Sequence, residues 1–373
     1  MDKKIIILIS LSIIIVILLV IFIVISQVTS YSPTQKNNLE ECNSLVYNGE
    51  NAFNLLFYSN KQDAEKYSNY FFKTYPFSEN KNTFNIYYID NYQPKCELYR
   101  GIAILCYSKE LIKKSASCPN DFIIVLKDEK SEIRSSSYMN VLSINSNHQL
   151  SVLSHEFGHA FGNFAEEYTP ASIPKGSQNC QLSCESFGEN KDGCFEGCSK
   201  DNAFRSIQSG VMRTLSTNIF GKYNDALLLS KINAKNKASI TGNVITGNAI
   251  NEENSCSEKN YYLIEATYKE DKINLISKTL ENGCFGENGE GPFTYKIIKE
   301  DNSEIPEKGF NPELIFTDSP KYEEIDGETY FQEGSFYLKI PEITNSKSLK
   351  ISLYGNNLVD TSLNDIGARP CII

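Results

Sequence analysis

The sequence contains almost no histidine, no tryptophan and none of the glycine-rich motifs that identify several large enzyme classes. It has no phosphate-binding GxxxxGKS/T loop, no GxGxxG after an expected strand and no GxSxG turn for a serine nucleophile. Lysine and arginine form no continuous stripe, and the 373 residues carry a net charge of −10 with a pI of about 5.1. These absences argue against nucleotide-dependent enzymes, serine hydrolases of that type and nucleic-acid binding.

The three histidines, His148, His155 and His159, all lie within twelve residues. On a helix, His155 and His159 stand one turn apart on one face, so both imidazoles can bind one metal ion. Glu156 follows the first of them and can take a proton from a water molecule beside the metal. A chance HExxH match is the alternative, and the scarcity of histidine argues against it. His148 is too far along to share the metal, and we expect it in a loop or at a helix start.

The spacing does not fix the third metal ligand. On an unbroken helix Glu166 would lie roughly 16 Å along the axis from His155, too far for a metal–oxygen bond of about 2.1 Å. A turn at Gly162 would bring Glu166 or Glu167 back to the metal. Otherwise the ligand lies elsewhere and the two carboxylates form a solvated helix end. We favour ligation by one of them and leave the choice open.

The segment His155–Tyr168, HEFGHAFGNFAEEY, resembles the metal-binding helix of the IgA peptidase family of metzincin-like zinc endopeptidases. In that family the helix looks like HEFGHSFGGLADEY, so Glu166 stands where an aspartate is usual. Ser209–Thr214 looks like the family's Met-turn, in which Met212 would lie beneath the metal; an ordinary core methionine is the alternative. Over roughly residues 42–232 the resemblance implies a metzincin-like catalytic domain with a twisted mixed sheet before the HExxH helix.

The resemblance implies a zinc-dependent endopeptidase that acts on protein or peptide substrates. Glu156 would be the general base, and Tyr168 is a further catalytic candidate that would orient a ligand or stabilise the oxyanion. The candidate ligands of one Zn²⁺ ion are His155, His159, Glu166 and Glu167. The alternative is a surface interaction protein that keeps a structural zinc or none.

A long apolar segment, Ile5–Ile25, follows Lys3 and Lys4. As a helix it would be about 31 Å long, which matches the hydrocarbon core of a bilayer. The charge asymmetry predicts a cytoplasmic N-terminus and an extracytoplasmic remainder. A cleaved signal peptide is the alternative, but its apolar region is usually only about 7–15 residues long. We therefore predict a single-pass membrane anchor over 1–25 and a polar tether over 26–41.

Cysteine is abundant, with 11 residues, an odd number that leaves at least one thiol unpaired or paired between chains. Four of them form a CxxxC-x9-CxxxC pattern after the HExxH segment, which suits a second zinc site, two disulfides or reduced thiols. The extracytoplasmic location favours disulfides, and we prefer the helical-hairpin pairing Cys180–Cys198 and Cys184–Cys194. Candidates for bridges in the catalytic half are Cys42, Cys96, Cys106 and Cys118. The C-terminal part holds Cys256, Cys284 and Cys371.

Patterns of apolar residues outline two domains of an α+β (α/β) protein. In the predicted catalytic domain, 42–235, Asp63–Tyr75 has helical spacing, Phe84–Ile89 alternates like a strand, and apolar runs suit a buried sheet at Ile102–Cys106 and Phe122–Leu126.

The near-repeat ITGNVITGN predicts a linker over 236–255. Short alternating strands separated by turn residues then predict a β-sandwich-like domain over 256–373. Its expected roles are scaffolding or contact with substrate or envelope proteins.

Overall fold

The structure is a computed structural model that describes residues 39–241, 256–321 and 324–364. The predicted anchor over 1–25 lies outside these ranges, as does most of the predicted tether and linker. Within the described ranges no helix is both long and apolar enough to cross a membrane. The described residues all belong to one compact unit.

An eight-stranded mixed sheet organises this unit, in the strand order β1-β3-β2-β6-β8-β7-β15-β16. Strands β3, β2, β6 and β8 are parallel, and the strands at both edges pair antiparallel with their neighbours. The strands predicted at Phe84–Ile89 and Phe122–Leu126 are confirmed as β3 and β6. The bounds are β1 Asn43–Val46, β2 Phe53–Tyr58, β3 Phe84–Ile89, β6 Phe122–Lys127, β7 Ser135–Tyr138, β8 Val141–Asn145, β15 Leu314–Lys321 and β16 Glu324–Phe331.

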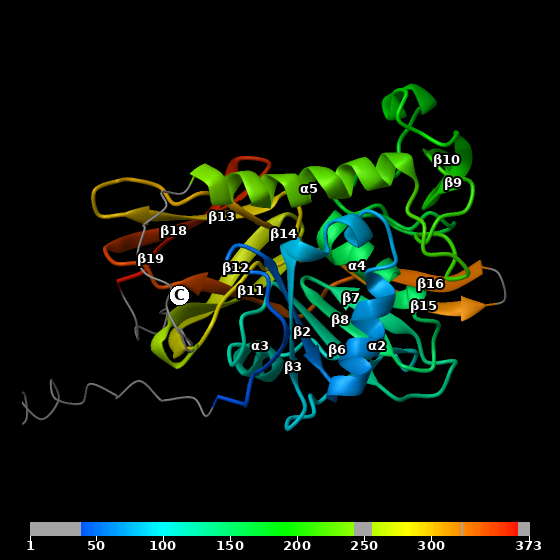
Figure 1. The fold of residues 1–373 in the computed structure, drawn as a ribbon. Helices are drawn as coiled ribbons and strands as arrows, with labels where there is room; N and C mark the ends of the chain where they lie inside the picture. The colour runs from blue at the N-terminus through cyan, green and yellow to red at the C-terminus, as the bar shows by residue number, and fades with distance from the viewer. Residues whose placement is uncertain (1–38, 242–255, 322–323, 365–373) are drawn as a thin grey trace, which may run out of the picture. The chain divides into compact units, whose positions relative to one another are not determined.

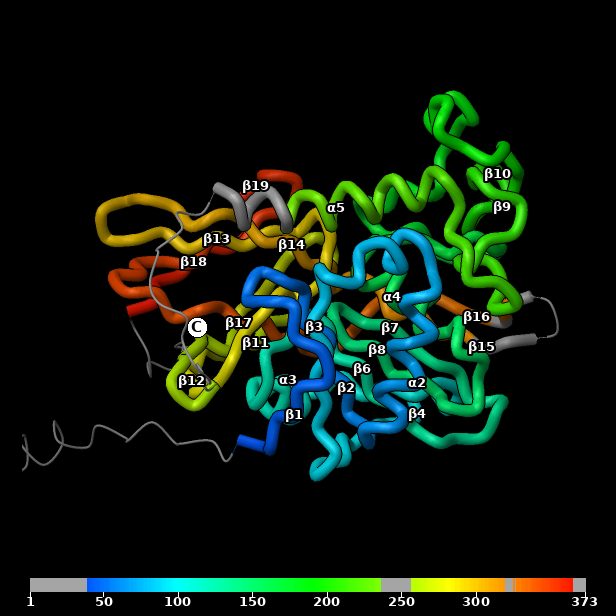
Figure 2. The backbone as a smooth tube through the Cα atoms, in the orientation of Figure 1, coloured from blue at the N-terminus to red at the C-terminus, as the bar shows by residue number. Residues whose placement is uncertain are grey.

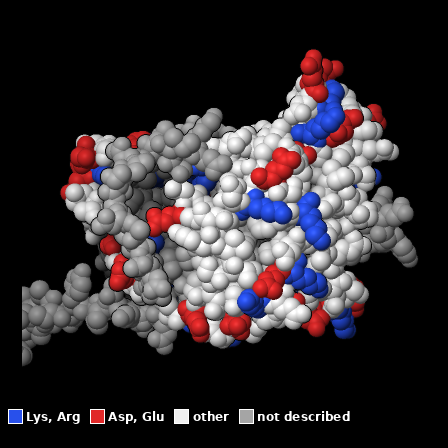
Figure 3. All heavy atoms as spheres, viewed as in Figure 1, with Lys and Arg blue, Asp and Glu red and all other residues white. Residues whose placement is uncertain are grey.

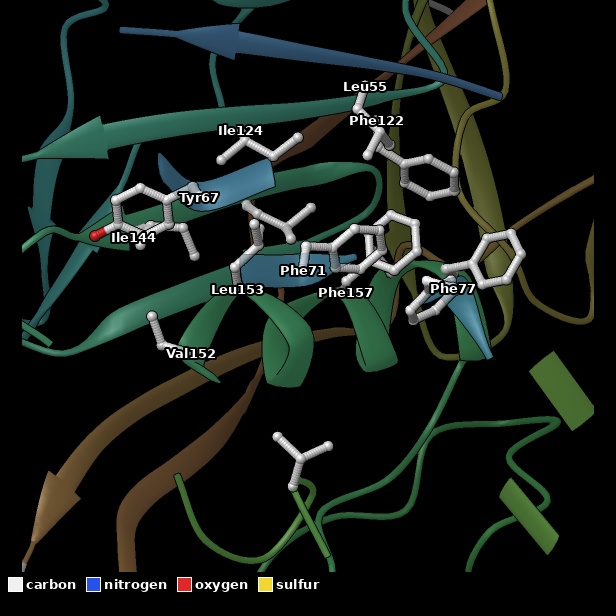
Figure 4. Close-up of a cluster of buried hydrophobic side chains, with 14 of the residues drawn as sticks. Leu55, Tyr67, Phe71, Phe77, Phe122, Ile124, Ile144, Val152, Leu153 and Phe157 are labelled. Carbon is white, nitrogen blue, oxygen red and sulfur yellow. The ribbon is translucent and has the colours of Figure 1, made fainter. Parts of the chain in front are cut away.

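Two helices cover one face of this sheet, α2 (Lys61–Phe71) and α4 (Ser151–Gly162) (Figure 1). Helix α2 begins at Asn60, whose side chain accepts a hydrogen bond from the Asp63 amide. Aromatic side chains fill the space between the helices and the sheet, as Figure 4 shows for Phe71, Phe77 and Phe157. Because burial of this apolar surface holds α4 against the sheet, the side chains on the other face of α4 must point away from the sheet.

On the other face of the sheet lie α3 (Lys109–Ser115) and a two-stranded ladder of β4 (Glu97–Tyr99) and β5 (Ala103–Leu105). The apolar run at Ile102–Cys106 therefore forms a buried strand, but β5 pairs with β4 in a separate small sheet. The remaining helical segments are α5 Lys222–Thr241 and the short 3-10 turns Phe77–Glu79, Lys81–Thr83, Cys184–Phe187 and Cys256–Glu258.

The C-terminal part forms two sheets that share one apolar core, with the strand orders β12-β11-β17 and β14-β13-β18-β19. The β15–β16 hairpin of the same part instead joins the eight-stranded sheet, because β15 pairs with β7. Figure 2 shows this hairpin beside β7 and apart from β13 and β18. The boundary predicted between 42–235 and 256–373 therefore does not separate the sheets. The strand bounds are β11 Asn260–Lys269, β12 Lys272–Asn282, β13 Phe293–Lys299, β14 Lys308–Phe310, β17 Ser335–Pro341, β18 Ser346–Leu353 and β19 Asn356–Ser362.

Disulfides connect the cysteines as predicted in the insert after α4. Cys180 is bonded to Cys198 and Cys184 to Cys194. The insert is not a helical hairpin, however, and holds instead the two-stranded sheet of β9 (Phe195–Cys198) and β10 (Lys200–Arg205). Glycines at 188, 193 and 197 disfavour a helix there. The other bridges are Cys42–Cys118, Cys96–Cys106 and Cys256–Cys284, whereas Cys371 lies outside the described residues.

Charged side chains of both signs are interspersed on the face of the molecule shown in Figure 3. Ion pairs at the surface of the molecule include Lys61 with Glu65 and Lys296 with Glu304. Mixed charge of this kind gives that face no extended positive field for a nucleic-acid backbone.

Candidate metal centre

Helix α4 directs His155 and His159 to the same point. Their Nε2 atoms lie 3.1 Å apart, and both rings are buried. The opposite side of the helix carries Phe157 and Phe161, which pack into the aromatic core. One face of α4 therefore packs on the apolar core and the other lines a buried polar site. No residue from Ser151 to Phe161 is exposed to solvent.

Backbone carbonyls fix which ring nitrogen of each histidine carries the proton. His155 Nδ1 lies 2.8 Å from the Val211 carbonyl, and His159 Nδ1 lies 2.8 Å from the Phe164 carbonyl. A carbonyl oxygen only accepts, so each Nδ1 must donate. In the neutral rings both Nε2 lone pairs therefore face each other, an arrangement that repels unless a cation lies between them.

The chain turns sharply after α4. Asn163 takes up the left-handed conformation, with φ 54° and ψ 37°, and the amides of Asn163 and Phe164 close the helix on the carbonyls of His159 and Gly158. The turn brings Glu166 back to the imidazoles. Its Oε1 lies 3.0 Å from His159 Nε2 and its Oε2 lies 3.5 Å from His155 Nε2.

Glu167 points away from the two histidines. Its Oε1 accepts hydrogen bonds from the amides of Asn224, at 2.8 Å, and Asn179, at 3.3 Å. Burial raises its pKa to about 7, although these amides act in the opposite direction. Of the two carboxylates, Glu166 therefore lies at the rings, whereas Glu167 connects α5, through Asn224, to the loop that holds Asn179.

A fourth side chain, which the sequence did not predict, reaches the same point from β15. Asp318 Oδ2 lies 3.3 Å from His155 Nε2 and 3.9 Å from His159 Nε2. Its other oxygen, Oδ1, accepts a hydrogen bond of 2.8 Å from the Tyr168 hydroxyl. Asp318 is 150 residues beyond Tyr168 in a segment that reads as an ordinary strand. No signal in the sequence connects it to the histidines.

The four side chains His155, His159, Glu166 and Asp318 could hold a metal ion, since one ligand atom from each lies within 4.8 Å of all the others. Ligand atoms around a tetrahedral ion with bonds of about 2.1 Å lie roughly 3.4 Å apart. The nitrogen–nitrogen and nitrogen–oxygen distances given above bracket that value. Both Glu166 oxygens and Asp318 Oδ2 are buried and have no hydrogen-bond donor among the described residues. A cation would satisfy these orphaned acceptors.

Electrostatic interactions within the group are strong because every member is buried. Burial opposes the charged form of His155, but the carboxylates of Asp318 and Glu166 outweigh it and raise its pKa to about 9. Burial and the neighbouring His155 lower the pKa of His159 to about 3. Burial also raises the pKa of Glu166 well above its usual range. For Asp318, burial is outweighed by the two histidines, and the pKa falls below its ordinary value.

Glu156 lies next to this group in α4. Its side chain is fully buried, and neither carboxylate oxygen has a hydrogen-bond partner in the described part of the chain. Burial raises its pKa well above the usual range, and the negative charges of Asp318 and Glu166 add to this effect. A buried carboxylate without a donor is costly, so a cation or a water molecule is expected to accompany it.

Tyr168 contributes its hydroxyl to the edge of the group, through the hydrogen bond to Asp318. Burial raises the pKa of this phenol well above its ordinary value. The hydroxyl is therefore a neutral donor bonded to a carboxylate beside the histidines.

Met212 packs beneath α4 at Gly158, where an added Cβ would overlap the Met212 sulfur. His148, outside the group, lies in the loop before α4, as expected. Its Nδ1 is 3.0 Å from the Ser135 hydroxyl and its Nε2 is 3.1 Å from the Ser131 carbonyl. Met212 therefore packs against α4 at Gly158, which lies between the two histidines in sequence, and His148 has a structural position.

A small cavity of about 20 Å³ borders His159, with Phe316 and Leu314 of β15 among its walls. The Phe316 ring lies parallel to the His159 ring, with 3.8 Å between centroids. The cavity is large enough for roughly one water molecule. The β15 strand therefore closes the group on the side opposite α4.

Among models of known protein families none matches this chain, and no curated protein matches its sequence.

Proposed function

We propose that this chain is a zinc-dependent endopeptidase, anchored in a membrane with its catalytic part outside the cytoplasm. The observation that carries the proposal is the 3.1 Å approach of two Nε2 atoms whose partner nitrogens already donate to carbonyls. Glu166 adds a carboxylate, and the set of two imidazoles and one carboxylate suits zinc in a catalytic site. The resemblance of the HEFGH segment to the IgA peptidase family points to the same chemistry.

Zinc bound at this point would polarise a scissile carbonyl and make a water molecule acidic. His155, His159 and Glu166 would hold it. Glu156 would accept the proton of the attacking water and pass it to the leaving amine. The Tyr168 hydroxyl, released from Asp318, would donate to the oxyanion.

A second candidate function is favoured by Asp318, which gives the site a fourth protein ligand. Structural zinc sites are closed by four protein ligands, whereas catalytic ones keep a position for water or substrate. On this interpretation the metal holds the β15–β16 hairpin in place, and the chain is a cell-surface interaction protein. The partner-binding parts would be the disulfide-bonded insert and the C-terminal strands.

The experiment that separates the two functions measures peptide hydrolysis and metal content together. Asp318 would fill the fourth coordination position of the metal, so a variant without it, Asp318→Ala, is compared with the unmodified full-length chain. Both proteins are loaded with Zn²⁺ and incubated with a proteome-derived peptide library. We expect Asp318→Ala to cleave peptides, and a chelator to abolish the cleavage.

The matched control adds Glu156→Gln to Asp318→Ala. This change keeps the size of the side chain and removes its basicity, so zinc stays bound while hydrolysis falls by at least about 100-fold. Hydrolysis that survives in the double variant would exclude Glu156 as the base. Zinc-loaded Asp318→Ala that cleaves no peptide would favour the structural role.

A further inference from the structure

We propose that the β15–β16 hairpin is an autoinhibitory latch that occupies the place of an extended peptide substrate on the edge of β7. This inference rests on the proposed peptidase function and names how that function is regulated. Asp318 would block the fourth metal position in the closed state, and withdrawal of the hairpin would open it.

The β15–β16 hairpin joins the eight-stranded sheet, whereas the other strands of the C-terminal part form two separate sheets. The chain leaves β14, which pairs with β13, forms the hairpin on β7 and returns to β17, which pairs with β11. Without the hairpin, the large sheet would end at β7. The backbone groups on that free edge could then pair with another extended segment.

The attachment of the hairpin to this edge is short. Strand β15 pairs with β7 at only three positions, centred on Thr317 opposite Ser136, whereas β15 and β16 pair with each other at eight. The hairpin therefore has its own internal ladder and can keep its shape when the three-residue contact with β7 is lost. Outside this ladder the hairpin is also held by the Ser172 amide, which donates to the Thr329 hydroxyl, and by Ile325, which packs into the core beside α4. Opening the latch must break these contacts, while the internal ladder of the hairpin can stay paired.

Strand β15 presents to α4 the side chains that a bound peptide would present. Asp318 places a carboxylate oxygen 3.3 Å from His155 Nε2, where a substrate carbonyl or attacking water would need to be. Two residues earlier on the same side of the strand, Phe316 stacks on the His159 ring. A peptide that replaces β15 would accordingly be extended and would carry an apolar side chain in the position of Phe316.

The closed arrangement depends on a glycine in the partner strand. Gly327 pairs with Asp318 across the hairpin. An added Cβ there would overlap both Asp318 Oδ1 and the Tyr168 hydroxyl. A side chain at position 327 would therefore displace Asp318 from the histidines without removing its carboxylate, and it offers a second way to open the site.

The test uses the full-length chain loaded with Co²⁺, which reports coordination through its visible spectrum, and acetohydroxamate, a small bidentate metal ligand. The variants are Asp318→Ala and Gly327→Ala. The control is Asp360→Ala, which removes an exposed aspartate that pairs with Lys350 on β18. Metal content, the spectrum and the affinity for acetohydroxamate are measured for each.

We expect all four proteins to keep one metal ion per chain. In the unmodified chain and Asp360→Ala, acetohydroxamate should leave the spectrum unchanged, because Asp318 fills the position. In Asp318→Ala and Gly327→Ala it should bind at least tenfold more tightly and change the spectrum. Probe binding to Asp318→Ala without peptide cleavage would show that Asp318 closes the metal position, but it would contradict the peptidase function and with it the autoinhibitory role. The latch is overturned if Asp318→Ala loses its metal, or if the unmodified chain binds the probe equally well.

Discussion

At the scale of single residues, the sequence predicted the histidine pair because a four-residue spacing is a property of the helix itself. His155 and His159 do converge, with Nε2 atoms 3.1 Å apart. The groups that orient them were not predictable. Val211 and the residues around it are distant in sequence from His155, and any residue can supply the carbonyl that binds Nδ1.

The choice between Glu166 and Glu167 also lay beyond the sequence. Adjacent side chains after a turn point in different directions, and which one returns depends on the backbone angles of the turn. The left-handed residue is Asn163, although the expected position of the turn was the neighbouring Gly162. Asparagine tolerates this conformation, so either residue was compatible with it.

The close contact between Gly158 of α4 and Met212 gives a prediction about stability and zinc affinity. In Gly158→Ala the new Cβ would overlap the buried Met212 sulfur and approach Phe220 to 3.0 Å. Overpacking of this kind costs about 1–3 kcal/mol, which equals or exceeds the roughly 1 kcal/mol that alanine gains over glycine in a helix, so Gly158→Ala should lower stability by up to about 2 kcal/mol. Met212 follows Val211, which holds His155, so the affinity for zinc should fall as well.

Urea unfolding and zinc titration check this expectation, with Gly334→Ala as the control, because nothing lies closer than 3.5 Å to an added Cβ there. Equal stability and equal zinc affinity in the two variants would show that Met212 does not support the helix.

At the scale of secondary-structure elements, local patterns were informative and pairings over long distances were not. Helix α4 follows from the HExxH spacing, and strands β3 and β6 follow from alternation and an apolar run, whereas the parallel strands β2 and β8 were not predicted. The four cysteines of the insert allow three pairings, and the preferred pairing of Cys180 with Cys198 is confirmed although the helical hairpin that suggested it is absent. The β15–β16 hairpin has the composition of any strand pair, and nothing in it specifies β7 as its neighbour. Asp318 was missed for that reason.

At the scale of the whole unit, one buried lysine connects the C-terminal strands to the large sheet. Lys339 of β17 is 1 % exposed, and its Nζ donates to the Ser115 hydroxyl at 2.9 Å and to the Asn120 side chain. Burial lowers its pKa to about 7, and the negative charge of Asp121 acts against this shift.

This lysine predicts a pH dependence of stability. An unfolded lysine keeps its proton up to a pH of about 10.4, whereas the buried amine loses it near 7. Between these values the unfolded state binds more protons, so the free energy of unfolding contributed by Lys339 rises with pH. Between pH 7 and pH 10 the contribution of Lys339 to the free energy of unfolding therefore rises by about 3 kcal/mol.

Denaturant unfolding at pH 7 and pH 10 measures the effect. Lys339→Met should show a smaller rise than the unmodified chain, and Lys350→Met, at a half-exposed position on β18, should match the unmodified chain. An identical pH dependence for all three proteins would mean that Lys339 is protonated throughout.

X-ray absorption of the zinc-loaded chain shows whether the two imidazoles one helical turn apart bind a single metal ion. We expect one zinc per chain, with two histidine nitrogens and carboxylate oxygens at about 2.0–2.2 Å, and no bound zinc after His155→Ala combined with His159→Ala. A chain that binds no zinc, or a double variant that binds it unchanged, would exclude a metal centre at these histidines.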